Sequence, residues 1–184
     1  MIKERIKEHQ QVVEKLLEND VPVIEAIAKI CKEALDDGHK ILLCGNGGSA
    51  ADSQHIAAEF VGRFVKERQG LPAIALTTDT SILTAVGNDY GYDEVFRRQV
   101  EALGREGDVL IGISTSGNSG NVVKAFEQAK KQGMKTIAFT GEKESKMSAM
   151  ADETLRVPSL VTARIQECHI MSGHLICEYI DEDY

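Results

Sequence analysis

Five short, mostly apolar runs recur along the chain, and helical segments separate most of them. The runs lie at residues 40–44, 73–76, 109–113, 136–139 and 154–157. A continuously apolar run of this length is typical of a strand that is buried on both faces of a parallel sheet. Parallel strands also need crossover connections, usually helices, between them. The sequence therefore predicts an α/β protein, a three-layer α/β/α sandwich around a central five-stranded parallel sheet.

The helices are predicted from apolar positions that recur with the period of an α-helix. Residues 2–35 carry such positions with one interruption at residues 19–22, so we expect an N-terminal pair of helices. Further helices are expected at 49–61, 92–102, 119–132 and 162–181. A chain of 184 residues is long enough for one sizeable core, and we expect a single domain over residues 1–184.

The composition excludes some classes of partner. The formal net charge is -8, and an acidic protein gains no counterion-release advantage on nucleic acid or anionic lipid, so neither partner is expected. The four cysteines form no CxxC pair, which favours reduced, buried thiols and a cytoplasmic protein. The N-terminal segment is charged and no apolar run follows it, so neither a secretory signal nor a membrane span is expected there.

Two loops that follow predicted strands have the composition of an anion site. In an open parallel sheet, ligands bind beyond the carboxyl ends of the strands, where loops lead into helix N-termini. The first loop, residues 45–49, has three glycines that permit close backbone approach, while Asn46 and Ser49 add side-chain donors. A tight strand-to-helix turn without any ligand also favours glycine, so this loop alone leaves both interpretations open.

The second loop, residues 114–119, is rich in hydroxyl groups. A hydrogen bond to a charged group contributes about 1.5–3 kcal/mol, so several hydroxyls at a helix start can hold one anion without lysine or arginine. A helix N-cap alone explains one serine but not four hydroxyls. The P-loop pattern and the third glycine of the dinucleotide fingerprint are both missing, so the loops indicate a single phosphate.

Two helices carry candidate metal ligands. His55 and Glu59 are four residues apart and share a helix face, and Gln166 and His174 are eight apart, a little over two turns. Imidazole and carboxylate suit zinc or a similar divalent ion, although glutamine is an unusual ligand. The alternative is a solvated His55–Glu59 pair with His174 packed in the core. His169 lies near the same face as His174, so the spacing does not choose between them.

These motifs resemble those of sugar isomerase (SIS) domain proteins of the phosphoheptose isomerase group. The resemblance rests on residues 45–59, on Asn88 with Asp89, on residues 114–119 and on Gln166 with His174. It implies conversion of D-sedoheptulose 7-phosphate to D-glycero-D-manno-heptose 7-phosphate, the first step toward ADP- or GDP-heptose and the heptose of bacterial lipopolysaccharide. It also implies a homotetramer with active sites between subunits, to which the helices of residues 1–36 are expected to contribute.

The resemblance implies roles for individual residues. Zinc, one ion per subunit, would be bound by His55, Glu59, Gln166 and His174, so the resemblance selects His174 over His169. Arg63 would help to neutralise the ligand, or is a solvated surface residue. Substrate binding is implied for a larger set: Asn46, Gly47, Gly48, Ser49, Glu59, Asn88, Asp89, Ser114, Thr115, Ser116, Ser119 and Gln166.

The implied chemistry is aldose–ketose isomerisation, which moves a proton between neighbouring carbons through an enediol. We expect Glu59 as the catalytic base and His174 as the acid, with the metal polarising the substrate oxygens. A metal-bound carboxylate or imidazole is a poorer proton carrier, so the ligand and catalyst roles are expected to alternate.

Two other functions fit parts of the pattern. One is a non-catalytic SIS-domain protein that binds a phosphosugar and associates with a replication initiator, and the other is an isomerase of five- or six-carbon sugar phosphates. A base and an acid beside a phosphate site argue against the first. The second shares the phosphate loop but gives no reason for this ligand set.

Overall fold

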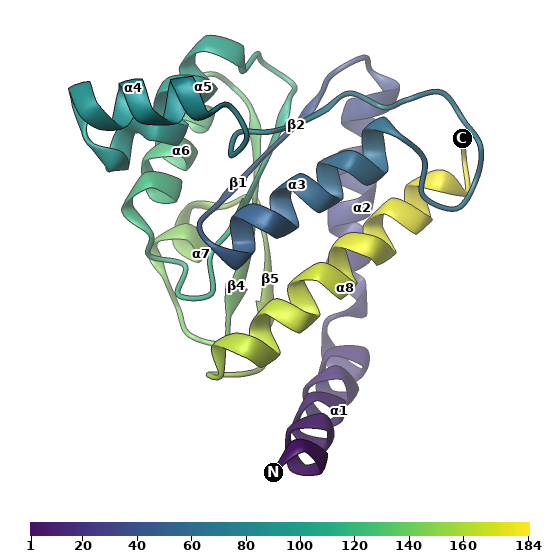
Figure 1. Ribbon diagram of the computed structural model, residues 1–184. Helices are drawn as coiled ribbons and strands as arrows, with labels where there is room; N and C mark the ends of the chain where they lie inside the picture. The colour runs from purple at the N-terminus through teal and green to yellow at the C-terminus, as the bar shows by residue number, and fades with distance from the viewer.

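The computed structural model describes residues 1–184 and contains one five-stranded parallel sheet (Figure 1). The strand order is β2-β1-β3-β4-β5, and every neighbouring pair is parallel. The strands are β1 (Ile41–Gly45), β2 (Ala73–Ala75), β3 (Val109–Ile113), β4 (Lys135–Gly141) and β5 (Glu153–Val157). The predicted sheet is confirmed, with all five apolar runs forming strands.

The apolar runs are continuous because the sheet is covered on both faces. Side chains alternate between the faces of a strand. Ile41 and Leu43 therefore join a core beneath one set of helices, while Leu42 and Cys44 join a second core on the opposite face. The first core is covered by α2 (Val21–Asp36), α3 (Gly48–Val61) and α8 (Thr162–Asp181), and the second by α5 (Val95–Leu103) and α6 (Gly120–Lys131).

The sheet has its topological switch point between β1 and β3. From β1 the chain crosses to β2, on one side of the sheet's centre, and from β3 it crosses to β4, on the other side. The connections after β1 and β3 therefore run in opposite directions from two adjacent strands. Ligands of open α/β sheets bind in the crevice outside such a point. The two loops that were predicted to hold an anion are therefore neighbours at the same edge of the sheet.

The N-terminal helical pair is also present, with its break at the predicted place. Helix α1 (Ile2–Asn19) ends at Asp20, and α2 follows at once with a proline in its first turn, where a missing N–H does no harm. Figure 1 shows α1 extending away from the body of the domain. Only Val12 and Leu16 of α1 are buried.

Two helices were not predicted. Helix α4 (Thr80–Tyr90) begins at Asp79, whose carboxylate accepts from the Ile82 N–H at 2.8 Å, and it has no buried residue. Helix α7 (Lys146–Met150) is a single short turn that buries only Met147. Neither helix has the wide apolar face on which periodicity depends. The predicted helix at 92–102 begins with a 3₁₀ turn over Tyr92–Glu94 before α5.

All four cysteines are free and buried, as the sequence predicted. Burial raises the pKa of the Cys44 thiol to about 12 and that of Cys168 to about 11, so these thiols are protonated at neutral pH. No helix has the length and apolar character that crossing a lipid bilayer requires.

Candidate functional site

The turn between β1 and α3 depends on its glycines. Gly47 has φ +56°, which L-residues rarely adopt, and it stands at the N-cap of α3. A Cβ at Gly45 would lie 2.8 Å from the Ser49 backbone oxygen, and a Cβ at Gly48 would lie 2.8 Å from Gln166 Nε2. The turn can therefore bring α3 and α8 together only because these positions lack side chains.

The loop between β3 and α6 gathers three serine hydroxyls. Ser114 Oγ lies 2.9 Å from Ser119 Oγ and 3.4 Å from Ser116 Oγ. Ser119 stands at the N-cap of α6, but its side chain makes no capping hydrogen bond. Gly117 has φ +63°, and a Cβ there would lie 2.1 Å from Ser145 Oγ. The serine hydroxyls thus gather at the N-terminus of α6, the end of a helix that favours an anion.

A cavity of about 170 Å³ lies between the two loops. No charged side chain lines it, so an anion there would be held by neutral donors and by the N-terminus of α6. Its lining residues are Asn46, Ser49, Ile113, Ser114, Thr115, Ser116, Ser119 and Gln166. Seven of these eight are among the residues expected to bind substrate, and Ile113 is the last residue of β3.

Asn46 is held in place by Asn121, a residue that the sequence did not single out. Asn46 Nδ2 donates to Asn121 Oδ1 at 2.9 Å, and Asn121 Nδ2 donates to Asn46 Oδ1 at 2.8 Å. This reciprocal amide pair joins the β1–α3 turn to the first turn of α6. Only tertiary structure brings the two amides together, so no sequence pattern identified Asn121.

His55, Glu59 and His174 form a compact cluster farther along α3 and α8. His55 Nε2 lies 3.1 Å from Glu59 Oε1 and 3.0 Å from His174 Nε2. One ligand atom from each residue lies within 4.8 Å of the others. The stacked i, i+4 pair on α3 was predicted, and α8 brings His174 to it.

The cluster fits a divalent metal ion. Two imidazole nitrogens and a carboxylate oxygen are donors that zinc accepts, and a tetrahedral ion with bonds near 2.0–2.1 Å separates its donors by about 3.3 Å. The donor separations of 3.0 and 3.1 Å around His55 are close to that value. Zinc takes four ligands, so these three donors leave one position for a further group.

His169 does not join the cluster. It is fully buried beneath β4, its Nε2 lies 3.0 Å from the Thr140 carbonyl oxygen, and its ring packs 5.7 Å from that of Phe139. Burial lowers the pKa of His169 to about 4, so the ring is neutral at physiological pH. The two histidines of α8 thus separate into a core residue and a site residue.

The other predicted site residues lie in different surroundings. Gln166 lines the serine cavity and packs against Gly48, eight residues before His174 on α8. Asn88 and Asp89 are exposed on α4, hydrogen-bonded to each other at 2.8 Å, and do not line the cavity of their own chain. Arg63 is exposed and lies 3.4 Å from Glu67.

Two further residues at the cluster were not identified from the sequence. The Phe64 ring stacks on His174, with centroids 5.4 Å apart and an interplanar angle of 24°. Asp52 is three residues before His55 on α3, and its Oδ2 is buried without a hydrogen-bond partner. Burial raises the pKa of Asp52, while the charges of His55 and His174 oppose that rise. The i, i+3 spacing to His55 is a signal that could have identified Asp52.

Fold and site together define a phosphosugar-binding α/β protein, and comparison with known proteins gives the family. The profile described as the SIS domain matches residues 6–141. A phosphoheptose isomerase of Nitratiruptor sp. is 57% identical over 183 residues, covering 100% of this chain and 98% of the relative. The chain belongs to the phosphoheptose isomerases of the SIS domain family.

Solved structures agree with this assignment. The phosphoheptose isomerase GmhA of Neisseria gonorrhoeae superposes with a TM-score of 0.92 at 48% identity, covering 99% of this chain and 100% of the other. The phosphoheptose isomerase of Francisella tularensis superposes with a TM-score of 0.95 at 41% identity, covering 98% and 96%. The expected SIS fold is therefore confirmed over nearly the full length of the chain.

Proposed function

We propose that this chain is an aldose–ketose isomerase that converts D-sedoheptulose 7-phosphate to D-glycero-D-manno-heptose 7-phosphate, the first step toward ADP- or GDP-heptose. Relatives that share more than half of its residues are phosphoheptose isomerases. A single SIS domain over residues 1–184 would carry the activity.

The observation that carries the proposal is the distance between the serine cavity and the His55–Glu59–His174 cluster. Ser49 of the cavity precedes His55 of the cluster by six residues on α3, which at 1.5 Å per residue is a rise of about 9 Å along the helix axis. Six carbon–carbon bonds of about 1.5 Å span about 8 Å in an extended zigzag. A seven-carbon chain with its phosphate in the cavity would therefore bring C1 and C2 to the cluster, and a shorter sugar would not reach as far.

Glu59 would act as the base in the proton transfer. Its carboxylate would take the proton from C1 while the ketone oxygen at C2 gains a proton, which gives the enediol. Return of a proton to C2 and loss of the proton from the C1 hydroxyl complete the aldose. His174 would carry the proton to and from the oxygens, and Phe64 would keep its ring oriented.

We propose zinc as the resident metal, bound by His55, Glu59 and His174, with the Gln166 amide oxygen as a fourth donor. When bound, the ion would supply Lewis-acid polarisation of the substrate oxygens. The donor set of imidazoles and carboxylate supports zinc.

We also propose a cytoplasmic homotetramer whose active sites lie between subunits. The exposed position of Asn88 and Asp89 supports this, because two residues expected at the substrate lie outside their own chain's cavity. Helices α1 and α2 (residues 1–36) would contribute to the contacts, since Ile2 and Ile6 are 74% and 57% exposed. The free, buried cysteines support a reducing compartment.

The test is to incubate the purified, zinc-loaded chain with five-, six- and seven-carbon ketose phosphates and to follow aldose formation by NMR. The proposal expects turnover of sedoheptulose 7-phosphate and much slower turnover of the shorter substrates. Binding without turnover would instead support the non-catalytic SIS module. Preferred turnover of a five- or six-carbon substrate would move the assignment to that class.

A further inference from the structure

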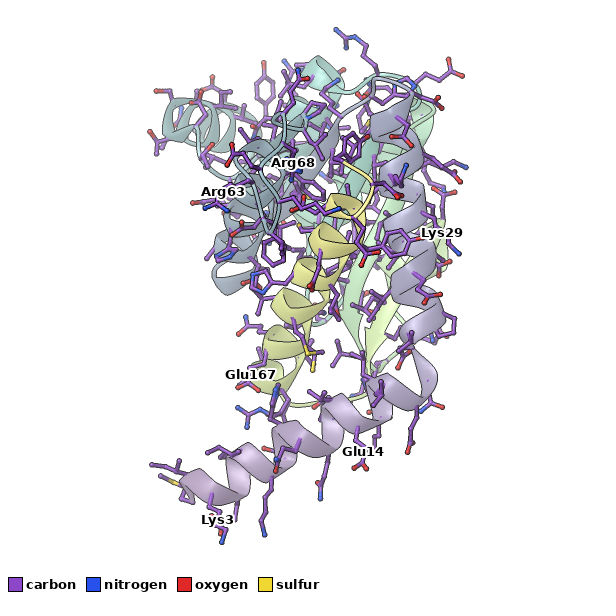
Figure 2. The ribbon with its side chains drawn as sticks, turned by 90° about the vertical axis from the view of Figure 1, so that its right-hand side faces the viewer. Lys3, Glu14, Lys29, Arg63, Arg68 and Glu167 are labelled. Carbon is purple, nitrogen blue, oxygen red and sulfur yellow. The ribbon has the colours of Figure 1, made fainter.

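A buried ion pair joins the two helices that carry the metal cluster. Arg68 Nε lies 2.6 Å from Asp181 Oδ1, and their side chains are only 2% and 1% exposed. Asp181 is the last residue of α8, and Arg68 lies in the segment 62–70 that follows α3 (Figure 2). Neither residue lines the serine cavity or belongs to the cluster.

Arg68 also binds the end of α3. Its Nη2 donates to the Glu59 carbonyl oxygen at 3.0 Å and its Nη1 to the Phe60 carbonyl oxygen at 2.9 Å. The last carbonyls of a helix have no intrahelical partner, and a guanidinium there both satisfies them and complements the helix dipole. The guanidinium is thus bonded directly to the backbone of the residue that serves as the base.

Asp181 supports His174, the cluster residue on α8, through hydrogen bonds to the same segment 62–70. Its Oδ2 accepts from the Val65 N–H at 2.7 Å and from the Lys66 N–H at 3.1 Å. These bonds hold the backbone next to Phe64, whose ring stacks on His174. One carboxylate therefore connects the end of α8 to the aromatic ring that supports a histidine two turns earlier in α8.

We propose that Arg68 and Asp181 are positioning residues that set the separation between the Glu59 carboxylate and the His174 imidazole. This inference rests on the proposed function of that cluster. The pair acts through the backbone of Glu59 on one side and through Phe64 on the other, without touching the reacting atoms. Its burial restricts the movement of α3 against α8, as a metal site with fixed donor spacing requires.

The chain offers a matched control in a second buried carboxylate. Asp108 Oδ2 pairs with Lys40 Nζ at 2.5 Å, and Asp108 accepts from the N–H groups of Lys40 and Arg105. Like Asp181 it is a buried carboxylate that binds one cation and two backbone N–H groups, but its partners are Lys40 and Arg105, and none of its bonds reaches α3, α8 or the segment 62–70. Losing it removes a partly buried ion pair without touching the cluster.

The experiment compares Asp181→Asn with Asp108→Asn, and the double variant Arg68→Met/Asp181→Leu with Lys40→Met/Asp108→Leu. The double variants replace each ion pair by apolar groups, so they keep the proposal testable where a single variant leaves a buried charge and unfolds. Each folded variant is measured for kcat, KM and Zn²⁺ affinity, the last by competition with a chelating dye on apo-protein.

Loss of the Arg68–Asp181 pair should lower kcat by about 10- to 100-fold and weaken Zn²⁺ binding about 10-fold, since supporting contacts of metal ligands typically have effects of this size. KM should change less than about threefold, because the serine cavity lies at the starts of α3 and α8, while the ion pair lies at their ends. The Lys40–Asp108 variants should keep both kcat and Zn²⁺ affinity.

Wild-type Zn²⁺ affinity in the folded Arg68→Met/Asp181→Leu variant would overturn the inference. An equal loss in the Lys40–Asp108 variants would do the same, because it would show a general loss of stability. The Zn²⁺ titration does not depend on turnover, so failure of the proposed reaction is distinguished from failure of the positioning role.

Discussion

At the scale of single residues, the proposed anion site of this protein offers hydroxyl groups rather than cations. The serine cavity has no charged lining, and the hydroxyls of Ser116 and Ser119 each lie within hydrogen-bonding distance of the Ser114 hydroxyl. A chain with a net charge of -8 can still bind a phosphate there, because the donors act locally. A phosphate there would be held by nearby hydrogen-bond donors and not by long-range attraction.

Removing one of these hydroxyls should weaken substrate binding and leave the chemical step intact. For Ser119→Ala we expect KM to rise about 10- to 100-fold with kcat changed only severalfold, because one hydrogen bond to a charged group is lost. Steady-state kinetics check this. Ser81→Ala, an exposed serine on α4, is the control, and an unchanged KM in Ser119→Ala would contradict the assignment.

His169 should make the fold sensitive to mild acid. Its pKa is about 4 in the folded protein against an ordinary 6.5, so the unfolded chain binds the proton more tightly. Above pH 6.5 the ring is neutral in both states, and the free energy of unfolding is unaffected. As the pH falls from 6.5 toward 4, the unfolded chain binds a proton that the folded protein does not, which lowers the free energy of unfolding by up to about 3 kcal/mol. Denaturant unfolding at pH 7 and pH 5 should show a smaller pH dependence in His169→Gln than in the wild type. Equal dependence in both would count against this prediction.

The residues that sequence could identify are those whose partners lie nearby in the chain. His55 with Glu59 follows from a spacing of four, and the hydroxyls of 114–119 are contiguous. Periodicity could not separate His169 from His174, because the difference is what each ring meets on another element. Asn121, Phe64 and Arg68 depend wholly on tertiary contacts, and no local pattern indicates them.

At the scale of elements, the two loops at the switch point work only with their glycines in place. Gly117 combines a positive φ of +63° with a Cβ position 2.1 Å from Ser145 Oγ. We expect Gly117→Ala to lower the free energy of unfolding by about 2–3 kcal/mol and to raise KM at least tenfold, because the serine loop must shift.

Gly38 supplies the control for that prediction. It has φ +81°, and an added Cβ would meet nothing within 4 Å. Gly38→Ala should therefore cost only the backbone term of about 1–2 kcal/mol and leave KM unchanged. Chemical denaturation and kinetics measure both variants, and equal effects on KM would contradict the steric explanation.

The sequence predicted the helices that bury one face and the strands that are buried on both faces. The strands read as apolar runs because both faces are covered, and α6 and α8 have clear apolar faces. Helix α4 was missed because none of its residues is fully buried, and α7 because five residues are too few for a periodic signal. Local sequence thus indicates elements that pack on their own chain's core.

At the scale of the whole molecule, α1 presents apolar side chains without a partner in its own chain. It extends from the domain in Figure 1, and Ile2 and Ile6 are exposed. Its first two turns are bonded to the start of α8, where Arg164 Nη1 donates to the Arg5 carbonyl oxygen at 3.0 Å and lies 3.3 Å from Glu8 Oε2. This arrangement suits a helix that completes its packing in an assembly.

Placing a charge on α1 should therefore disrupt the proposed tetramer. We expect Ile6→Glu to shift the mass measured by light scattering toward dimer or monomer, with kcat/KM falling in proportion to the tetramer lost. Lys7→Glu, on a neighbouring exposed position, is the control for the added charge. A fully active monomer would contradict the proposal that active sites lie between subunits.

The central claim is that Glu59 acts on the open carbon chain of a sugar anchored by its phosphate. The most direct measurement is the turnover of sedoheptulose 7-phosphate by Glu59→Gln at saturating substrate, followed by NMR, with substrate affinity measured by calorimetry. If Glu59 is the base, kcat should fall by about 10²–10⁴ while the substrate affinity stays within a few-fold of the wild type. Turnover within tenfold of the wild type would contradict it.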